Sequence, residues 1–180
     1  MARVLVTGGV RSGKSRYAEE LVDPAAPALY LTPGYPADSA DPEWASRVAA
    51  HQLRRPTTWR TLETLDLAGG IAGAGVPVLV DCLGVWVTRL FDSWEAWEAP
   101  AEQWRDRFDA EVAGLTAALS ASPVPVVVVT NEVGWGVVSP YRSGRMFADQ
   151  LGRLNQAVAG VCDEVILMVS GRPLRLPAAD

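Results

Sequence analysis

The chain has 180 residues, of which 49% are hydrophobic and 21% are charged, which is typical of one globular domain and not of a disordered segment. Its formal net charge is −5 and it carries no run of Lys and Arg, so we expect no nucleic-acid partner. No apolar stretch approaches the roughly 20 residues that span a bilayer, and we expect no signal peptide because the first apolar run is predicted to form a strand. We therefore expect a single domain over residues 1–180, no membrane span and a cytoplasmic location. The two cysteines, Cys82 and Cys162, lie in or beside apolar runs, and their spacing indicates neither a disulfide framework nor a metal site.

A glycine-rich segment follows the first apolar run, Val4 to Val6, and precedes an expected helix over Arg16 to Val22. It has the pattern G-x-x-x-x-G-K-S between a strand and a helix, which is the context in which this pattern binds phosphates. Glycines let the backbone curl so that N–H groups point at phosphate oxygens. A glycine turn with an incidental Lys-Ser pair is the alternative, but both the spacing and the context fit the phosphate loop. The predicted nucleotide-binding residues are Gly8, Gly9, Val10, Arg11, Ser12, Gly13, Lys14 and Ser15.

Two side chains of this loop have specific expected roles. Lys14 is the only lysine of the chain and would reach the β- and γ-phosphates. The hydroxyl of Ser15 would coordinate Mg²⁺. The motif therefore predicts a nucleoside triphosphate site but does not specify the reaction.

The remaining chain alternates between strands and helices. Strands are expected at 28–31, 57–62, 77–81, 125–130 and 164–169, the last being the final strand of the chain. Helices are expected at 43–53, 65–72, 85–91, 102–120 and 145–160, and the tail from Pro177 is expected to be frayed. This alternation predicts an α/β fold of the P-loop NTPase type (RecA-like), with a mostly parallel sheet and helices on both faces. The functional site is then expected at the carboxyl ends of the strands.

Several polar residues follow these strands. Asp81 ends an apolar strand, which is typical of a Walker B aspartate beside a P-loop. Asn131 and Glu132 follow the most hydrophobic strand, where they could equally bind a ligand or cap the next turn. Five tryptophans are expected to serve in packing or subunit contacts rather than as a platform for a flat ligand: Trp86, Trp94, Trp97, Trp104 and Trp135.

The only histidine, His51, lies near the end of a predicted helix and just before Arg54 and Arg55. A lone histidine is more often structural than reactive, but imidazole is well suited to nucleophilic work near neutral pH. The two arginines are suited to holding phosphate oxygens, although an exposed charged turn explains them equally well. An imidazole placed beside them could attack an α-phosphate and carry the nucleotidyl group as a phosphoramidate.

The whole chain resembles the bifunctional adenosylcobinamide kinase/adenosylcobinamide-phosphate guanylyltransferases of cobalamin biosynthesis. Any one block of the resemblance is weak outside the P-loop, but all of them occur in order from Val4 to Val169. The blocks are residues 5–16, Arg47-x-x-x-His51, Arg55-Pro56-x-x-Trp59-x-Thr61-x-Glu63, residues 80–83, residues 129–134, Arg145-x-Phe147-x-Asp149-x-x-Gly152-x-x-Asn155-Gln156, residues 163–165 and residues 169–171.

The resemblance implies a two-step enzyme. It would phosphorylate the aminopropanol hydroxyl of adenosylcobinamide with ATP or GTP, and then transfer GMP from GTP to that phosphate through a guanylylated histidine. His51 falls on the nucleophile position of the family. Positions that contact the guanine nucleotide correspond to Pro33, Gly34, Tyr35, Gln52, Leu53, Arg54, Arg55, Glu63 and Asp81. The resemblance also implies a homotrimer that takes a corrinoid substrate, with Mg²⁺ as the metal.

Two other functions are compatible with a P-loop. One is a GTP-dependent switch, because residues 81–84 match D-x-x-G. Such proteins also carry an N-K-x-D motif, which is impossible here because Lys14 is the only lysine. The other is a small-molecule ATP kinase without nucleotidyl transfer, in which His51 is structural. Glu63, similarly, could serve only at the entry of the following helix.

Overall fold

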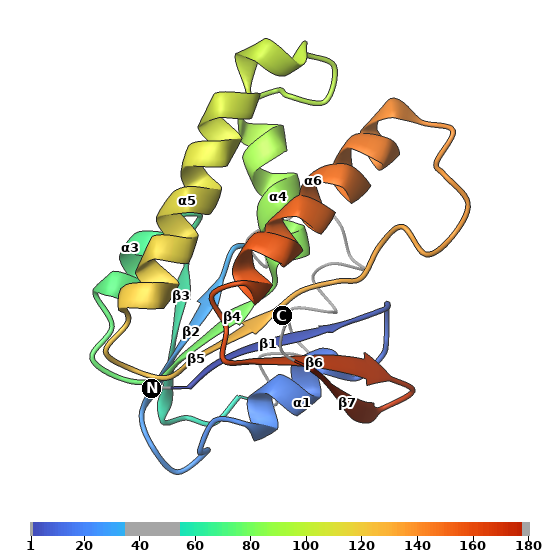
Figure 1. Cartoon of the computed structure of the whole chain (residues 1–180). Coiled ribbons are helices and arrows are strands. Elements are labelled where there is room, and N and C mark those ends of the chain that lie inside the picture. Colours follow the sequence, from blue (N-terminus) through green and yellow to red (C-terminus); the bar gives the residue numbers. More distant parts are fainter. Residues whose placement is uncertain (1, 35–54, 178–180) are drawn as a thin grey trace.

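The computed structural model describes residues 2–34 and 55–177 of the chain. Within these ranges, seven strands form one sheet in the order β3-β2-β4-β5-β1-β6-β7, shown in Figure 1. Six strands run parallel, and β7 pairs antiparallel with β6. The strands are β1 (Arg3–Gly8), β2 (Ala28–Thr32), β3 (Trp59–Glu63), β4 (Val78–Asp81), β5 (Val126–Val129), β6 (Glu164–Val169) and β7 (Arg172–Leu176).

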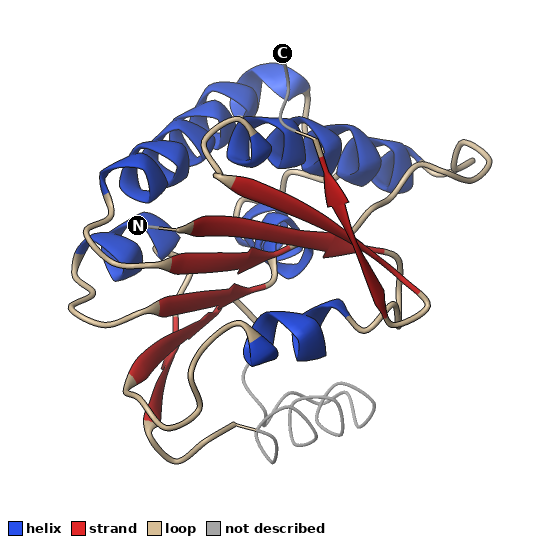
Figure 2. Ribbon diagram, turned by 60° about the horizontal axis from the view of Figure 1, so that its bottom comes forward, coloured by secondary structure: helices blue, strands red, loops and turns tan. Residues whose placement is uncertain are grey.

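Helices cover both faces of the sheet, as Figure 2 shows, which confirms the predicted α/β architecture. They are α1 (Lys14–Glu20), α3 (Leu67–Ala72), α4 (Leu83–Ser93), α5 (Arg105–Ala121) and α6 (Arg142–Ala159), with a 3₁₀ turn at Ala101–Gln103. In the described part of the chain, no helix is both long and apolar enough to cross a membrane.

The two faces of the sheet bury alternate residues of the same strands, because successive side chains of a strand point to opposite sides. Leu5 of β1 and Val128 of β5 pack in the core beneath α3, α4, α5 and α6. Val6 and Val129, their neighbours in sequence, pack in a smaller core with Ala18 of α1. The strands are apolar on both sides, as a central parallel sheet requires.

Helices α4 and α5 meet in an aromatic cluster. The ring of Phe91 lies 5.1–5.3 Å from the rings of Trp97, Trp104 and Phe108, and 6.1 Å from that of Trp94. Trp86 and Trp104 are buried as well. The expectation that the tryptophans serve in packing is thus confirmed for four of them, whereas Trp135 is 76% exposed.

The prediction that β6 is the last strand is wrong. The chain turns at Ser170 and Gly171, which have φ angles of 51° and 77°, and returns along β6 as β7. Two consecutive residues with positive φ form a tight hairpin turn. Every residue of β7 is exposed, so its sequence lacks the apolar alternation that marks a half-buried strand.

Helix boundaries differ from prediction by a few residues. Helix α4 begins at Leu83 and not Val85, because Cys82 with its extended backbone is the residue before the first helical turn. Helix α6 begins at Arg142, three residues before the predicted start, and α5 begins at Arg105 after the separate 3₁₀ turn. The helix predicted at 43–53 lies outside the described residues.

Candidate nucleotide site at the carboxyl ends of β1, β4 and β5

The P-loop connects β1 to α1 and is tightly packed at its base. A Cβ atom at Gly8 would lie 2.7 Å from the carbonyl oxygen of Met168 and 2.7 Å from Oγ of Ser12, so no larger residue fits without displacing the backbone. Gly13 has a φ of 91°, a conformation that glycine adopts without strain. Local geometry therefore explains why glycine occupies both positions that the motif specifies, Gly8 and Gly13.

The β6–β7 turn supports the loop from outside. The N–H of Gly171 donates to the carbonyl of Ser12 at 2.9 Å, and a Cβ on Gly13 would lie 3.4 Å from the Cα of Gly171. The hairpin that sequence reasoning missed thus contacts the predicted phosphate loop. Ser12 itself is buried, and among the described residues its hydroxyl has no hydrogen-bond partner.

Lys14 is the first residue of α1, and its Nζ donates to the carbonyl of Gly9 at 3.2 Å. The ammonium group therefore lies over the loop that the motif assigns to phosphate. Ser15 follows in the first turn and is half-buried, whereas Val10 and Arg11 are exposed at the loop tip. Arg11 has a φ of 57° and so helps the backbone turn at the tip.

Asp81 lies at the end of β4, as the Walker B pattern predicts. Its Oδ2 accepts a hydrogen bond of 2.9 Å from the hydroxyl of Tyr30 on the neighbouring strand β2. Burial and the charge of Asp81 raise the pKa of Tyr30 well above its usual value, so this hydroxyl keeps its proton and remains a donor.

Arg55 packs against the ring of Tyr30. Its guanidinium carbon lies 3.6 Å from the centre of the Tyr30 ring, and its Nη1 donates to Oγ1 of Thr61 at 3.1 Å. Arg55 is half-buried and therefore not an exposed charge of a solvated turn. Tyr30 thus contacts a cation, Arg55, through its ring and a carboxylate, Asp81, through its hydroxyl.

The loop after β2 is anchored by a residue that the sequence did not single out. Arg89 of α4 donates from Nη1 to the carbonyl oxygens of Pro33 and Gly34, both of which are buried. Glu63 ends β3 with its side chain exposed. It is not the cap of the next helix, since Asp66 fills that role by accepting a 2.7 Å hydrogen bond from the N–H of Gly69.

Asn131 and Glu132, which follow β5, have different environments. Oδ1 of Asn131 accepts a weak 3.6 Å contact from the thiol of Cys82, and its carbonyl accepts from Asn155 at 3.0 Å. Glu132 instead faces the P-loop strand, where its Oε1 accepts a 2.7 Å hydrogen bond from the hydroxyl of Thr7. Asn131 thus ties β5 to α4 and α6, and Glu132 ties it to β1.

The strand order explains which predicted residues come together. Because β4, β5 and β1 are neighbours, Asp81, Glu132 and the P-loop share one edge of the sheet. Pro33, Gly34 and Glu63 follow β2 and β3 farther along that edge. Tyr35, His51, Gln52, Leu53 and Arg54 lie outside the described residues, so their predicted roles stay predictions.

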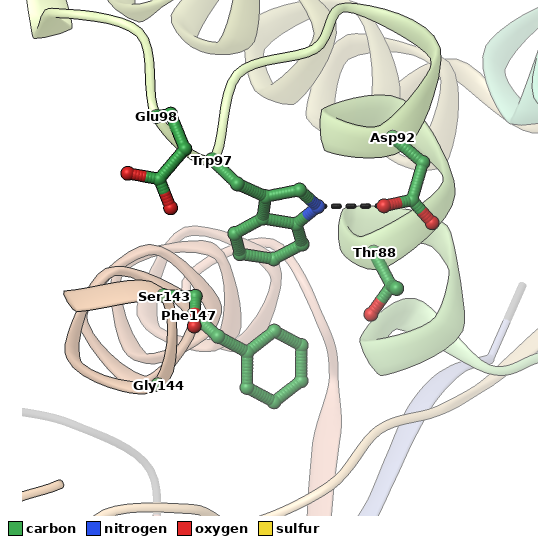
Figure 3. Close-up of a pocket in the computed structure, with 7 residues that line it drawn as sticks. All are labelled: Thr88, Asp92, Trp97, Glu98, Ser143, Gly144 and Phe147. Atoms are coloured by element: carbon green, nitrogen blue, oxygen red, sulfur yellow. Dashed lines mark hydrogen bonds between the residues drawn. The ribbon is translucent and has the colours of Figure 1, made fainter. Parts of the chain in front are cut away.

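A pocket of about 510 Å³ lies between α4 and α6, apart from the P-loop. Figure 3 shows Trp97 and Phe147 facing this space, with the indole N–H of Trp97 donating to Asp92 at 2.6 Å. Its other lining residues are Thr88, Glu98, Ser143 and Gly144. The pocket is acidic and aromatic, which does not suit a triphosphate, so the P-loop edge remains the candidate nucleotide site.

Neither cysteine forms a disulfide. Burial raises the pKa of Cys82 to about 11 and that of Cys162 to about 12, so both remain protonated thiols near neutral pH. In the described residues no group of three or more His, Cys, Asp or Glu side chains could hold a metal ion. Oxygen donors at this end of the sheet include the Ser15 hydroxyl and the carboxylates of Asp81 and Glu132.

Two solved structures align with most of this chain at low sequence identity. An ATPase of the type III secretion system of pathogenic bacteria aligns with a TM-score of 0.49 and 14% identity, covering 92% of this chain and 50% of its own. The P4 protein of bacteriophage phi6, in complex with ADP, aligns with a TM-score of 0.42 and 18% identity over 96% of this chain and 54% of its own. The chain thus spans about half the length of these two structures.

Comparison with protein families gives a match over nearly the whole chain. Residues 4–176 match the family model for cobinamide kinase / cobinamide phosphate guanyltransferase. Bifunctional adenosylcobalamin biosynthesis protein CobU of Salmonella typhimurium is 41% identical, and that of Escherichia coli is 38% identical; each alignment covers 93% of this chain and 96% of the relative. CobP of Pseudomonas aeruginosa, which has the same descriptive name, is 39% identical over 97% of this chain and 96% of its own length. The chain therefore belongs to the cobinamide kinase / cobinamide phosphate guanyltransferase family.

Proposed function

We propose that this chain, acting as one domain over residues 1–180, carries both activities of its family. It phosphorylates adenosylcobinamide with ATP or GTP, and it transfers GMP from GTP to adenosylcobinamide phosphate, giving adenosylcobinamide-GDP. The observation that carries the proposal is the P-loop with Lys14 and Ser15 beside Asp81, set in a chain that matches the family over its length.

In the kinase step, the P-loop residues Gly8 to Ser15 bind the triphosphate. The N–H groups of the loop and the ammonium of Lys14 offset the charge of the phosphates as the γ-phosphoryl group transfers. The carbonyl of Gly9, which accepts from Lys14 in the structure, would yield that donor to a phosphate oxygen. The protein supplies positioning and electrostatics here, because phosphoryl transfer needs little covalent chemistry from side chains.

The residues present fit Mg²⁺, which takes one or two protein oxygens together with substrate phosphates and waters. The hydroxyl of Ser15 is the proposed ligand. Asp81, fixed by the Tyr30 hydroxyl at 2.9 Å, is the carboxylate that would hold a water of the ion. When bound, Mg²⁺ neutralises charge on the phosphates.

In the guanylyl step, His51 is the proposed nucleophile that attacks the α-phosphorus of GTP, with pyrophosphate leaving. The corrinoid phosphate then takes the GMP group from the histidine. Arg55, whose guanidinium stacks on the ring of Tyr30, is proposed to hold a nucleotide phosphate. The other proposed guanine-nucleotide contacts are Pro33, Gly34, Tyr35, Gln52, Leu53, Arg54, Glu63 and Asp81.

The proposal is tested by supplying adenosylcobinamide with Mg²⁺ and ATP or GTP and following products by mass spectrometry. The expected products are adenosylcobinamide phosphate with either nucleotide and adenosylcobinamide-GDP only when GTP is present. Phosphate product without any GDP adduct under GTP would instead support a plain kinase. Absence of both products, with nucleotide bound, would contradict the proposal.

The position of Gly84 argues against the alternative function of a GTP-dependent switch. In the D-x-x-G segment at residues 81–84, Gly84 is buried inside α4, and a Cβ there would lie 3.0 Å from Oδ1 of Asn131. A nucleotide switch needs a segment that changes its conformation with the γ-phosphate. Gly84 is held in α4 against the side chain of Asn131, which opposes such a change.

We also propose a homotrimer in the cytoplasm. Supporting association, the loop between β5 and α6 exposes four large apolar side chains, Trp135, Val137, Val138 and Tyr141, each at least 75% exposed. Light scattering after gel filtration would give three times the chain mass of 19.3 kDa for a trimer. A mass of one chain at micromolar concentration would contradict it.

A further inference from the structure

Glu132 is attached to the P-loop strand by two hydrogen bonds. Its backbone N–H donates to the carbonyl of Gly8 at 3.1 Å, which continues the β5–β1 ladder past the end of β5. Its Oε1 accepts a 2.7 Å bond from the hydroxyl of Thr7, a residue that is only 3% exposed. The carboxylate is therefore positioned at the point where β1 becomes the phosphate loop.

Glu132 lies on one particular side of the sheet. Thr7 is two residues after Leu5, so its side chain points to the face covered by α3, α4, α5 and α6. The P-loop leads into α1, which packs on the opposite face. Glu132, bonded to Thr7, thus lies on the α4–α6 side of the strand that leads into the phosphate loop.

Glu132 is a second carboxylate at this end of the sheet, besides Asp81, which is the one proposed to serve the metal ion of the nucleotide. Glu132 is half-buried, and within residues 2–34 and 55–177 it has a neutral hydroxyl as donor and no ion pair. A negative charge beside a phosphate loop opposes the binding of a triphosphate unless it serves the metal ion or accepts a proton. Because Asp81 is proposed for the ion, Glu132 is available to accept a hydrogen bond from a hydroxyl that must lose its proton.

We propose that Glu132 is a catalytic residue of the kinase step, which contacts the acceptor hydroxyl of the corrinoid side chain. Oε2, the oxygen that Thr7 leaves open, accepts a hydrogen bond from this hydroxyl and then its proton. At the same time the hydroxyl oxygen bonds to the γ-phosphorus, and the bond from that phosphorus to the β,γ-bridging oxygen breaks. The nucleoside diphosphate leaves, and the proton on Glu132 passes to solvent.

This inference rests on the proposed kinase function, but it makes a separate prediction. Transfer of GMP to the histidine involves no hydroxyl acceptor, so it does not need Glu132. A residue that binds the nucleotide or its metal ion would affect both reactions. Comparing the kinase and self-labelling activities of a Glu132 variant therefore distinguishes a role toward the acceptor hydroxyl from a role toward the nucleotide.

The test is Glu132→Gln, assayed for phosphorylation of adenosylcobinamide and, without corrinoid, for self-labelling by α-labelled GTP. We expect kcat of the kinase step to fall by about 10² or more, the usual contribution of a general base. The KM for nucleotide and the extent of self-labelling should stay within about twofold of wild type, because neither depends on the acceptor hydroxyl. Retained self-labelling also shows that the variant is folded. Glu132→Asp should restore part of the kinase rate.

Two further variants complete the test. Glu20→Gln removes an exposed acid of α1 that pairs with Arg16, and should leave both reactions unchanged. Thr7→Val removes the hydroxyl that holds Glu132 and should lower kcat of the kinase step less than Glu132→Gln does, again sparing self-labelling.

The inference is overturned if Glu132→Gln phosphorylates the corrinoid at the wild-type rate. It is equally overturned if kinase and self-labelling fall together with a higher Mg²⁺ requirement, since Glu132 would then support the nucleotide and its ion. A wild-type chain that binds nucleotide but never phosphorylates the corrinoid would contradict the proposed function itself.

Discussion

At the scale of single residues, Lys14 should matter for both reactions. It is the only lysine in the chain, it begins α1, and its ammonium lies over the loop carbonyl of Gly9. Replacing it with Met removes the positive charge while keeping much of the side-chain length.

We expect Lys14→Met to lower the kinase rate by about 10² or more, since removing one preorganised donor to transition-state charge has effects of this size. Self-labelling with α-labelled GTP should fall as well, because the same loop holds the triphosphate. Steady-state kinetics and label counting measure both effects. Arg16→Gln, on the exposed side of α1, is the control. Wild-type rates in Lys14→Met would show that the loop does not bind the reacting phosphates.

At the scale of elements, the packing of α4 against α5 depends on Phe91. This ring is fully buried and contacts four other aromatic rings within 6.1 Å. The same helix begins just after Asp81 and holds the β2 loop through Arg89, so its position bears on the site as well as on stability.

Phe91→Ala should lower the free energy of unfolding by about 3–5 kcal/mol, the usual loss for emptying an aromatic site in a core. Urea denaturation followed by tryptophan fluorescence measures this change. Leu174→Ala is the control, because this apolar side chain of β7 is 56% exposed and its loss should cost within about 0.5 kcal/mol. A loss below about 1 kcal/mol for Phe91→Ala would mean that the cluster is loosely packed.

At the scale of the whole molecule, Asp163 joins the two ends of the sequence. Its carboxylate accepts from the backbone N–H of Arg3 at 2.7 Å and from the guanidinium of Arg3 at 2.7 and 3.1 Å. These hydrogen bonds from Arg3 lower the pKa of Asp163 from 3.8 to about 2. The folded state therefore favours the charged carboxylate.

The stability contributed by this lowered pKa is present above about pH 4 and is lost as the pH falls towards 2. We expect Asp163→Asn to melt at a lower temperature than wild type at pH 7, with the difference shrinking between about pH 4 and pH 2. Calorimetry at several pH values measures this difference in melting temperature. A difference that stays constant down to pH 2 would show that the charge of Asp163 is not the cause.

The sequence predicted the parts of the fold that are encoded locally. The strand, loop and helix around Gly8 to Ser15 follow from one motif, and the carboxyl end of β4 follows from an apolar run that stops at Asp81. By contrast, β7 is exposed throughout and contains Pro173, so nothing in its pattern distinguishes it from a tail.

The contacts that assemble the site were harder to predict, because they join distant parts of the chain. Tyr30 and Asp81 are 51 positions apart, and Thr7 and Glu132 are 125 apart. No spacing rule connects such pairs until the strand order is known. Arg89 gave no signal either, since an arginine in an amphipathic helix is usually a solvated residue. The role of His51 as nucleophile comes from the family resemblance and stays a prediction.

The most direct measurement is therefore the labelling of the protein by α-labelled GTP with Mg²⁺ and no corrinoid, on wild type and on His51→Ala. Transfer through His51 predicts label that stays on denatured wild-type protein, is released by acid as expected of a phosphoramidate, and is absent from His51→Ala. Wild-type protein that binds GTP and leaves it intact, or His51→Ala labelled as well as wild type, would contradict transfer through a guanylylated His51.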